Sequence, residues 1–323
     1  GMSYGMMACV QMNRREEFDR LWKWTRTYMY IEDGPCKNYF AWSCATDGSK
    51  NAEGPAPDGE EYFAMALFFA SHRWGDGEGI YCYSGQARKI LRACIHKGEN
   101  GRPGYPMWNH ENRQILFVPG SDFTDPSYHL PHFYELFALW ADEEDRLFFK
   151  EAAKVSRKYL AKACHEKTGM SAEYAEFDGQ PMSRPLPWTT DRHDWFFSDA
   201  YRTVANIGLD YEWFGIDEGQ YEAPEKLLRF LDARWDEDPF EIYEVDGTSL
   251  HEPALHPVGL QVTTTQGILS VLGRTKDEES IRIAKKWLEE FFRMPLREGD
   301  RRYYDNCLYF FAFLALSGNY RIW

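Results

Sequence analysis

Asp199, Arg202 and Asn206 are spaced so that a helix would place all three side chains on one face. Asp199 would lie at the start of that helix, where the helix dipole favours an ionised carboxylate. A carboxylate that stays ionised can act as a general base. The same spacing is also typical of an ordinary N-cap with an i,i+3 ion pair. The segment alone therefore leaves both interpretations open.

Asp58 is a second carboxylate that precedes a long apolar segment. The run Asp58-Gly59-Glu60 stands where this segment, Glu60 to Trp74, is expected to begin a helix. An acidic residue at this position is a common N-cap. A capping carboxylate can also face a cleft, so the two roles can hold together.

Histidine does not indicate a metal or a nucleophile here. His251 and His256 lie five residues apart in a loop that contains proline, but no third ligand stands at a useful spacing. His193 has no Ser or Cys nucleophile motif beside it. We therefore expect neither a metal nor a cofactor.

Composition restricts the partners of this chain. Its 323 residues are 44% hydrophobic and 17% aromatic, and no linker-like tract divides them, so one domain over residues 1–323 is expected. The formal charge of -14 argues against nucleic acid or an anionic membrane surface as a partner. Apolar runs such as Phe63 to Ala70 are too short to span a bilayer.

The cysteines and aromatic residues also restrict the interpretation. Seven cysteines are scattered along the chain with no Cys-x-x-Cys pair, which is typical of reduced, mostly buried thiols in a cytoplasmic protein. The chain carries 12 Trp, 20 Tyr and 22 Phe. Aromatic side chains are core material first, but such an excess also suits a cleft that stacks on the apolar faces of sugar rings.

Helical periodicity recurs along the whole chain. Eleven helices are expected: Met2 to Asn13, Glu16 to Tyr30, Glu60 to Trp74, Gln86 to Lys97, Leu130 to Ala141, Glu143 to Lys167, Trp195 to Leu209, Ala223 to Trp235, Gly259 to Leu272, Lys276 to Arg293 and Asp305 to Leu316. Long loops, at 31–59, 98–128, 168–194 and 236–258, follow about every second helix. This pattern indicates helical hairpins in a ring, with function carried by the long loops. Gln114 to Val118 is the best candidate for a strand.

Four separated segments resemble glycoside hydrolase family 8, and they occur in the order found in that family. The segments are Gly1-Met2-Ser3-Tyr4-Gly5-Met6-Met7, then Ala45-Thr46-Asp47-Gly48 with Asp58-Gly59-Glu60, then Asp125-Pro126-Ser127-Tyr128, and Asp199-Ala200-Tyr201-Arg202. The resemblance implies an all-α (α/α)6 barrel of six helical hairpins. It also implies hydrolysis of β-1,4-linked oligosaccharides with inversion. Eleven expected helices are one short of that barrel, so its first helix is expected to be missing.

The resemblance also assigns roles. Asp199 matches the general base, and Asp58 matches an acidic residue that binds the sugar at the cleavage point and helps to distort it. Further substrate contacts are expected from Tyr4, Tyr128, Arg202, His251, His256 and one of the two loop tryptophans, Trp42 and Trp108. Tyr134 is expected to pack in the core.

The general acid of this family is a Glu directly before the segment that Gly1 begins. The resemblance therefore implies that the acid stands just upstream of Gly1. Loss of a general acid typically costs about 10²–10⁴-fold in rate. We expect residues 1–323 by themselves to cleave xylo-oligosaccharides slowly or not at all while still binding them.

Within the family, the chain is most similar to the exo-acting branch that releases xylose from the reducing end of xylo-oligosaccharides. The residues that carry this similarity are the Trp188 to Trp195 stretch and the loop Leu255-His256-Pro257. Ala254 departs from it, since a polar residue is expected there. Two alternatives stay open: an endo-acting xylanase, cellulase or lichenase, and a non-catalytic oligosaccharide-binding protein.

Overall fold

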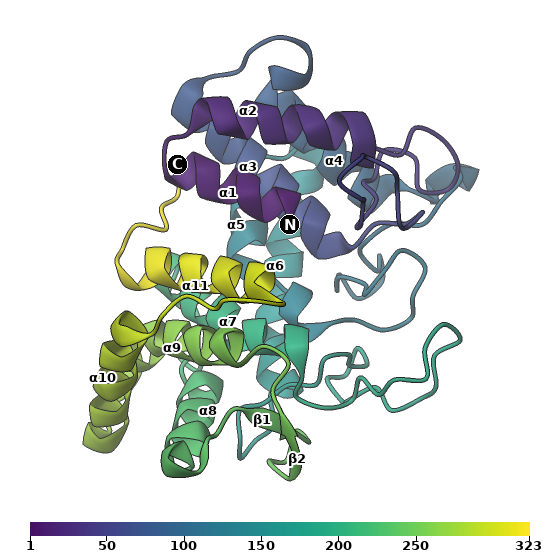
Figure 1. The fold of residues 1–323 in the computed structure, drawn as a ribbon. Coiled ribbons are helices and arrows are strands. Elements are labelled where there is room, and N and C mark those ends of the chain that lie inside the picture. The colour runs from purple at the N-terminus through teal and green to yellow at the C-terminus, as the bar shows by residue number, and fades with distance from the viewer. The chain divides into compact units, whose positions relative to one another are not determined.

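The computed structural model describes all residues from Gly1 to Trp323. Contacts between residues divide them into two compact units (Figure 1). The first comprises Gly1–Asp122, Phe133–Val155 and Arg321–Trp323, and the second comprises Phe123–His132 and Ser156–Tyr320. A single domain over residues 1–323 stays a prediction.

The structure contains eleven α-helices, as predicted, and one two-stranded antiparallel sheet. The helices are α1 Met2–Gln11, α2 Arg15–Trp24, α3 Pro57–Trp74, α4 Tyr83–His96, α5 Pro131–Trp140, α6 Arg146–Ala163, α7 Arg202–Trp213, α8 Glu222–Asp232, α9 Pro257–Arg274, α10 Glu278–Arg293 and α11 Arg302–Leu316. The strands are β1 Glu241–Tyr243 and β2 Ser249–Pro253. None of the helices is long and apolar enough to cross a membrane.

Two local predictions were wrong. Gln114 to Val118 is no strand, since only Ile115 forms an isolated bridge, with Trp108. The helix expected from Trp195 begins at Arg202 instead, because the preceding chain is extended and Phe196 N–H donates to Tyr243 O at 2.8 Å.

In the first unit, α3 packs against α1 and α4, and α1 also packs against α2. The segment Phe63–Ala70 of α3 is buried on all sides, as the nearly continuous apolar sequence indicated. Two acidic side chains are buried with it. Glu60 accepts a hydrogen bond from Phe40 N–H at 2.8 Å, and Glu61 accepts one from Tyr134 Oη at 2.6 Å. Tyr134 is fully buried, so the prediction that it packs in the core is confirmed.

In the second unit, α9 is the central helix and packs against α7, α8, α10 and α11 (Figure 1). The contact between α7 and α9 is close because glycines lie at it. A Cβ on Gly208 would stand 2.6 Å from Gln266 O and 3.0 Å from Gly267 Cα. These backbone atoms cannot move aside as a flexible side chain can.

Gly208→Ala is therefore expected to destabilise the protein by about 1–3 kcal/mol, because α7 and α9 must move apart to admit the methyl group. Gly59→Ala is the matched control. Gly59 also lies in a helix, but nothing stands within 4 Å of its Cβ position, so alanine should stabilise by about 0.5–1 kcal/mol. Urea unfolding measures both, and equal effects at the two sites would contradict the close approach.

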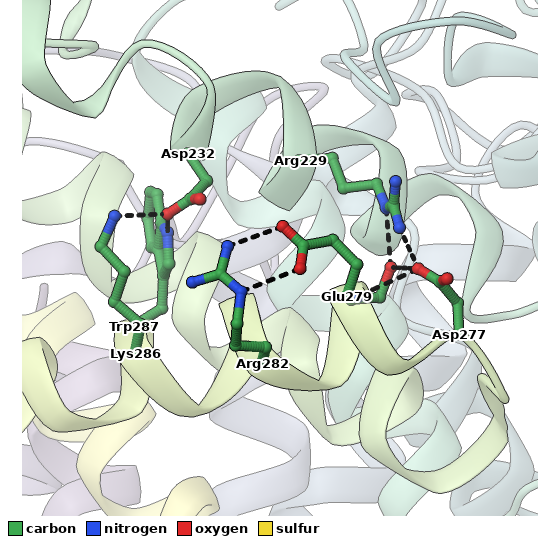
Figure 2. A network of polar contacts seen from close by, with 8 residues as sticks. Arg229, Asp232, Asp277, Glu279, Arg282, Lys286 and Trp287 are labelled. Atoms are coloured by element: carbon green, nitrogen blue, oxygen red, sulfur yellow. Dashed lines mark hydrogen bonds and ion pairs between the residues drawn. The ribbon is translucent and has the colours of Figure 1, made fainter.

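A polar network joins α8 to α10 on the surface of the second unit (Figure 2). Asp232 at the end of α8 accepts hydrogen bonds from Lys286 at 2.8 Å and from the Trp287 indole at 2.9 Å. Arg229 donates to Asp277 and to Ser280 Oγ. Asp277 is the N-cap of α10, since its side chain accepts from Ser280 N–H. The network sets the register of α10 on α8.

Candidate active site

The carboxylate of Asp199 is held from two sides. Asp199 lies in a 3₁₀ turn, Ser198–Tyr201, directly before α7. Its Oδ1 accepts a hydrogen bond from Tyr304 Oη at 2.6 Å, and its Oδ2 lies 3.2 Å from Arg202 Nη2. The Asp199 side chain keeps 33% of its surface exposed. A carboxylate that is oriented by two donors and still open to water has the geometry of a general base.

Arg202 is buried and connects Asp199 to the turn Pro126–Tyr128. Its guanidinium donates to Ser127 Oγ at 2.9 Å and lies 5.5 Å from the centre of the Tyr128 ring. Asn206, one turn further along α7, donates to the Ser127 carbonyl at 2.8 Å. The predicted shared face of Arg202 and Asn206 is thus present, and it packs on this turn. Tyr128 is brought beside Asp199 through Arg202.

Asp125 is a buried carboxyl near Asp199. The sequence alone did not indicate a role for it. Its Oδ1 accepts from Ser127 N–H at 2.7 Å, and its Oδ2 has no hydrogen-bond partner. Burial, and then the negative charge of Asp199, hold the pKa of the Asp125 carboxyl well above its ordinary range. Asp125 therefore holds its proton more tightly than a solvent-exposed aspartate does. The cue in the sequence was the Asp-Pro-Ser spacing of a capped turn.

His256 reaches the site through Tyr304. The two rings lie 4.7 Å apart between centres, and His256 Nδ1 lies 3.3 Å from Asp305 Oδ2. Asp305 also accepts from Gly259 N–H at 2.5 Å and from Arg297. Burial alone would raise the pKa of Asp305, but these hydrogen bonds outweigh it and lower the pKa below its ordinary value. The ionised carboxylate thus orients His256.

His251 lies apart from this cluster. It is exposed on β2, and its Nδ1 lies 3.3 Å from Ser249 Oγ, whereas His256 is buried. The two histidines therefore have different hydrogen-bond partners and share none. No group of three His, Cys, Asp or Glu side chains is arranged to hold a metal ion.

The remaining candidates belong to the first unit. Asp58 lies in the first turn of α3 but does not cap it, because the helix begins earlier, at Pro57, and Ala56 is the N-cap. The ring of Tyr4, on α1, packs edge-on against Tyr62 at 4.7 Å. Because Asp58 and Asp199 belong to different units, the role of Asp58 beside the base stays a prediction.

The two loop tryptophans differ sharply. Trp42 is 65% exposed. Trp108 is fully buried, with Tyr134 and Phe149 edge-on against its ring at 5.5 and 5.7 Å. A sugar can therefore stack on Trp42 without rearrangement, whereas the indole of Trp108 is part of the core.

The buried Glu173 pairs with the partly buried His193 in the second unit. Glu173 Oε2 lies 2.7 Å from His193 Nδ1, and the His193 ring stacks on Tyr174 at 4.2 Å. Burial raises the pKa of Glu173 to about 7, although the hydrogen bond from His193 opposes the shift. His193 is thus hydrogen-bonded to Glu173, a partner that the sequence did not indicate.

The raised pKa of Glu173 predicts a pH dependence of stability. Between the ordinary pKa of 4.5 and about 7, the folded protein keeps a proton that the unfolded chain releases. The free energy of unfolding should therefore fall as pH rises through this window, by about 3 kcal/mol in total. Thermal unfolding measured at several pH values in this window should show that the unfolding temperature of Glu173→Gln falls less with rising pH than that of the wild type. Glu176→Gln, at a partly exposed position, should keep the slope, and a slope unchanged in Glu173→Gln would contradict the assignment.

Comparison with known proteins identifies the family of this chain. The sequence profile of the glycosyl hydrolases family 8 matches residues 1–316. A reducing end xylose-releasing exo-oligoxylanase of Halalkalibacterium halodurans is 55% identical over 324 residues, which cover 100% of this chain and 80% of that protein. The exo-oligoxylanase Rex8A of Paenibacillus barcinonensis is 53% identical, with 100% and 82% covered.

Solved structures show the same relation. The structure of Rex8A complexed with xylose matches with a TM-score of 0.93 at 52% identity and covers 100% of this chain and 82% of that one. The match confirms the predicted all-α class and its (α/α)6 barrel. The chain therefore belongs to the glycosyl hydrolases of family 8.

Proposed function

We propose that this glycoside hydrolase cleaves β-1,4-linked xylo-oligosaccharides with inversion and releases xylose from the reducing end. The observation that carries the proposal is the Asp199 carboxylate, which is open to water and held by Tyr304 and Arg202. The relatives that are more than half identical over the whole chain support the substrate and the exo action.

In this proposal Asp199 takes a proton from the water that attacks the anomeric carbon, while the glycosidic bond breaks and its oxygen takes a proton from a second carboxyl, the general acid of an inverting pair. An inverting enzyme places its two carboxyls about 6.5–9.5 Å apart so that this water fits below the sugar. Tyr304 and Arg202 fix the direction of the Asp199 carboxylate. The raised pKa of Asp125 lessens the negative charge near that carboxylate. Tyr128, whose ring centre lies 5.5 Å from the Arg202 guanidinium carbon, would contact the sugar or the water.

We propose further contacts from exposed side chains such as Trp42 and from buried ones such as Tyr4 and His256. We propose that Trp42 stacks on a sugar ring and that Asp58 and Tyr4 contact the sugar at the cleavage point. His256, held by Asp305, would recognise a hydroxyl of the reducing sugar. His251 is exposed on β2 and would contact only a part of the substrate that extends past His256.

Two substrates test the proposal. Fluoride leaves without a proton donor, so β-xylobiosyl fluoride reports on the base alone, whereas xylotriose reports on the complete reaction. The first product seen by proton NMR should be the α anomer. With reducing-end-labelled xylotriose the label should appear only in xylose.

Other outcomes would support other functions. A β anomer as first product would exclude inversion. Internal cuts in long xylans or in cellulose would favour endo action. Binding of xylotriose with no turnover of either substrate would favour a non-catalytic sugar-binding protein.

We further propose a reducing, cytoplasmic setting. All seven cysteines are free thiols in the structure, and only Cys94 and Cys164 are buried, so the expectation of mostly buried thiols was wrong. Partly exposed free thiols oxidise in secreted proteins, which favours a reducing compartment. Thiol titration of protein taken from its native cells should find seven free thiols, and any disulfide would contradict this setting.

A further inference from the structure

The N-terminal end of α9 is capped from another helix. α9 begins at Pro257, and its N-cap residue, His256, makes no side-chain hydrogen bond to the helix. Instead Asp305, on α11, accepts a hydrogen bond from the amide N–H of Gly259 at 2.5 Å. A Cβ on Gly259 would stand 2.9 Å from the same carboxylate oxygen, so glycine permits this approach. Asp305 therefore pairs one of the amides that a helix start leaves without a partner.

The same carboxylate fixes which nitrogen of His256 carries the proton. Asp305 Oδ2 lies 3.3 Å from His256 Nδ1. Burial raises the pKa of Asp305, but its hydrogen bonds outweigh burial and lower the pKa below its ordinary value, so the carboxylate is ionised and only accepts. In the neutral imidazole Nδ1 therefore carries the proton, and Nε2 can accept a hydrogen bond from a hydroxyl. Nε2 is not one of the buried unpaired atoms of the protein, and the His256 side chain keeps 9% of its surface exposed.

Arg297 connects this carboxylate to the residue before His256. Its Nη1 donates to Asp305 Oδ2 and also to the carbonyl oxygen of Leu255, which lies 3.1 Å away. The backbone of Arg297 is fixed by Asn306, which accepts from Arg297 N–H at 2.9 Å and donates to the Arg297 carbonyl at 3.0 Å. One guanidinium thus holds the chain just before His256 against the carboxylate that orients the imidazole.

The base is held by a residue of α11 to which Arg297 is not hydrogen-bonded. The hydroxyl of Tyr304 donates to Asp199 at 2.6 Å, and the ring centre of Tyr304 lies 4.7 Å from that of His256. The hydrogen bonds of the Arg297 guanidinium go to the two acceptors named above. A change at Arg297 can therefore loosen His256 while the base keeps its own hydrogen bond.

We propose that Arg297 is a positioning residue for the sugar at the reducing end. It keeps His256 in place, through Asp305 on one side and Leu255 on the other, so that Nε2 faces a hydroxyl of that sugar. This inference rests on the proposed function, in which His256 recognises the reducing sugar. It adds that this recognition depends on a side chain that touches neither the sugar nor the base.

Two ligands separate recognition of the reducing sugar from the rest of binding. Xylotriose ends in a sugar ring, whereas xylotriitol, its borohydride-reduced form, ends in an open chain. Titration calorimetry of the whole chain should show that the wild type binds xylotriose about three- to tenfold more tightly, the effect of one hydrogen bond. Arg297→Met removes the donors and should reduce this preference to less than about twofold. β-Xylobiosyl fluoride carries fluorine in place of the reducing sugar, so its hydrolysis should fall by less than about twofold in the same variant.

Three further variants control for a simple loss of structure. Arg297→Lys keeps a cation that can donate to both acceptors and should recover part of the preference. Asn306→Leu keeps the guanidinium but frees the Arg297 backbone, so it should also lower the preference. Arg302→Met is the matched control, because Arg302 donates to the Gly299 carbonyl at 2.8 Å and to neither acceptor of Arg297. This control should bind both ligands as the wild type does.

Four results would overturn the inference. The wild type binds both ligands equally, Arg297→Met keeps the full preference for xylotriose, Arg302→Met loses as much of it as Arg297→Met, or fluoride hydrolysis in Arg297→Met falls as far as the preference does. Failure of the proposed reaction is a separate outcome. A wild type that releases no fluoride sinks the reaction, whereas a preference lost in Arg297→Met and kept in Arg302→Met still supports the positioning role.

Discussion

Asp199→Asn is expected to lower the hydrolysis of β-xylobiosyl fluoride by about 10²–10⁴-fold. Asparagine has the same size and can still meet Tyr304 Oη, which lies 2.6 Å from Oδ1 in the wild type. It cannot accept a proton from the attacking water. Fluoride release, followed with an ion-selective electrode, gives the rate for both proteins.

Two further variants locate the effect. Asp246→Asn makes the same chemical change at an exposed turn, where the side chain accepts hydrogen bonds from Thr248, so its rate should match the wild type. Tyr304→Phe removes one hydrogen bond to the carboxylate and should cost about ten- to a hundredfold, because hydrogen bonds to charged groups contribute about 1.5–3 kcal/mol. A loss below about tenfold in Asp199→Asn would show that another group is the base.

Arg157→Met is expected to destabilise the protein by about 3–5 kcal/mol. The side chains of Arg157 and Asp210 are only 6% and 1% exposed, so methionine would leave the Asp210 charge buried with Gln220 as its main donor. Chemical unfolding of wild type and variant, monitored by Trp fluorescence, measures the difference.

The matched control is Lys154→Met on the same helix. Lys154 pairs with Glu151 at 2.8 Å, but the side chains are 54% and 45% exposed, so the loss should not exceed about 0.5 kcal/mol. Replacing both members of the buried pair, in Arg157→Met with Asp210→Leu, should recover much of the stability lost in the single variant. If Arg157→Met were as stable as Lys154→Met, the prediction would be contradicted, because solvent would then have to reach the pair of Arg157 and Asp210.

The sequence predicted most of the helical framework because helices are local. The period of apolar residues located all eleven helices, and the i,i+3 spacing predicted the contact between Asp199 and Arg202. Errors lay where distant contacts compete with local preference. The bridge between Phe196 and Tyr243 delays the start of α7, and pairing across residues 241–253 forms the two strands that the periodicity did not indicate.

The tyrosine that orients Asp199 could not be predicted from the sequence. Tyr304 lies 105 residues after Asp199. The hydrogen bond between the two residues forms in a unit where α7 and α11 both pack against α9. Trp42 and Trp108 look alike in the sequence, since both stand in long loops. Only tertiary packing separates them, because it surrounds Trp108 with aromatic rings and leaves Trp42 exposed.

The sequence by itself thus determined the fold class and the family, and it predicted the carboxylate that we propose as the base, because these depend on local periodicity and on short motifs. The tertiary structure decided that Tyr304 also orients that carboxylate and that burial raises the pKa of Asp125 near it. Burial, pKa shifts and unpaired atoms arise from residues far apart in the chain, so they become visible only after the helices have packed.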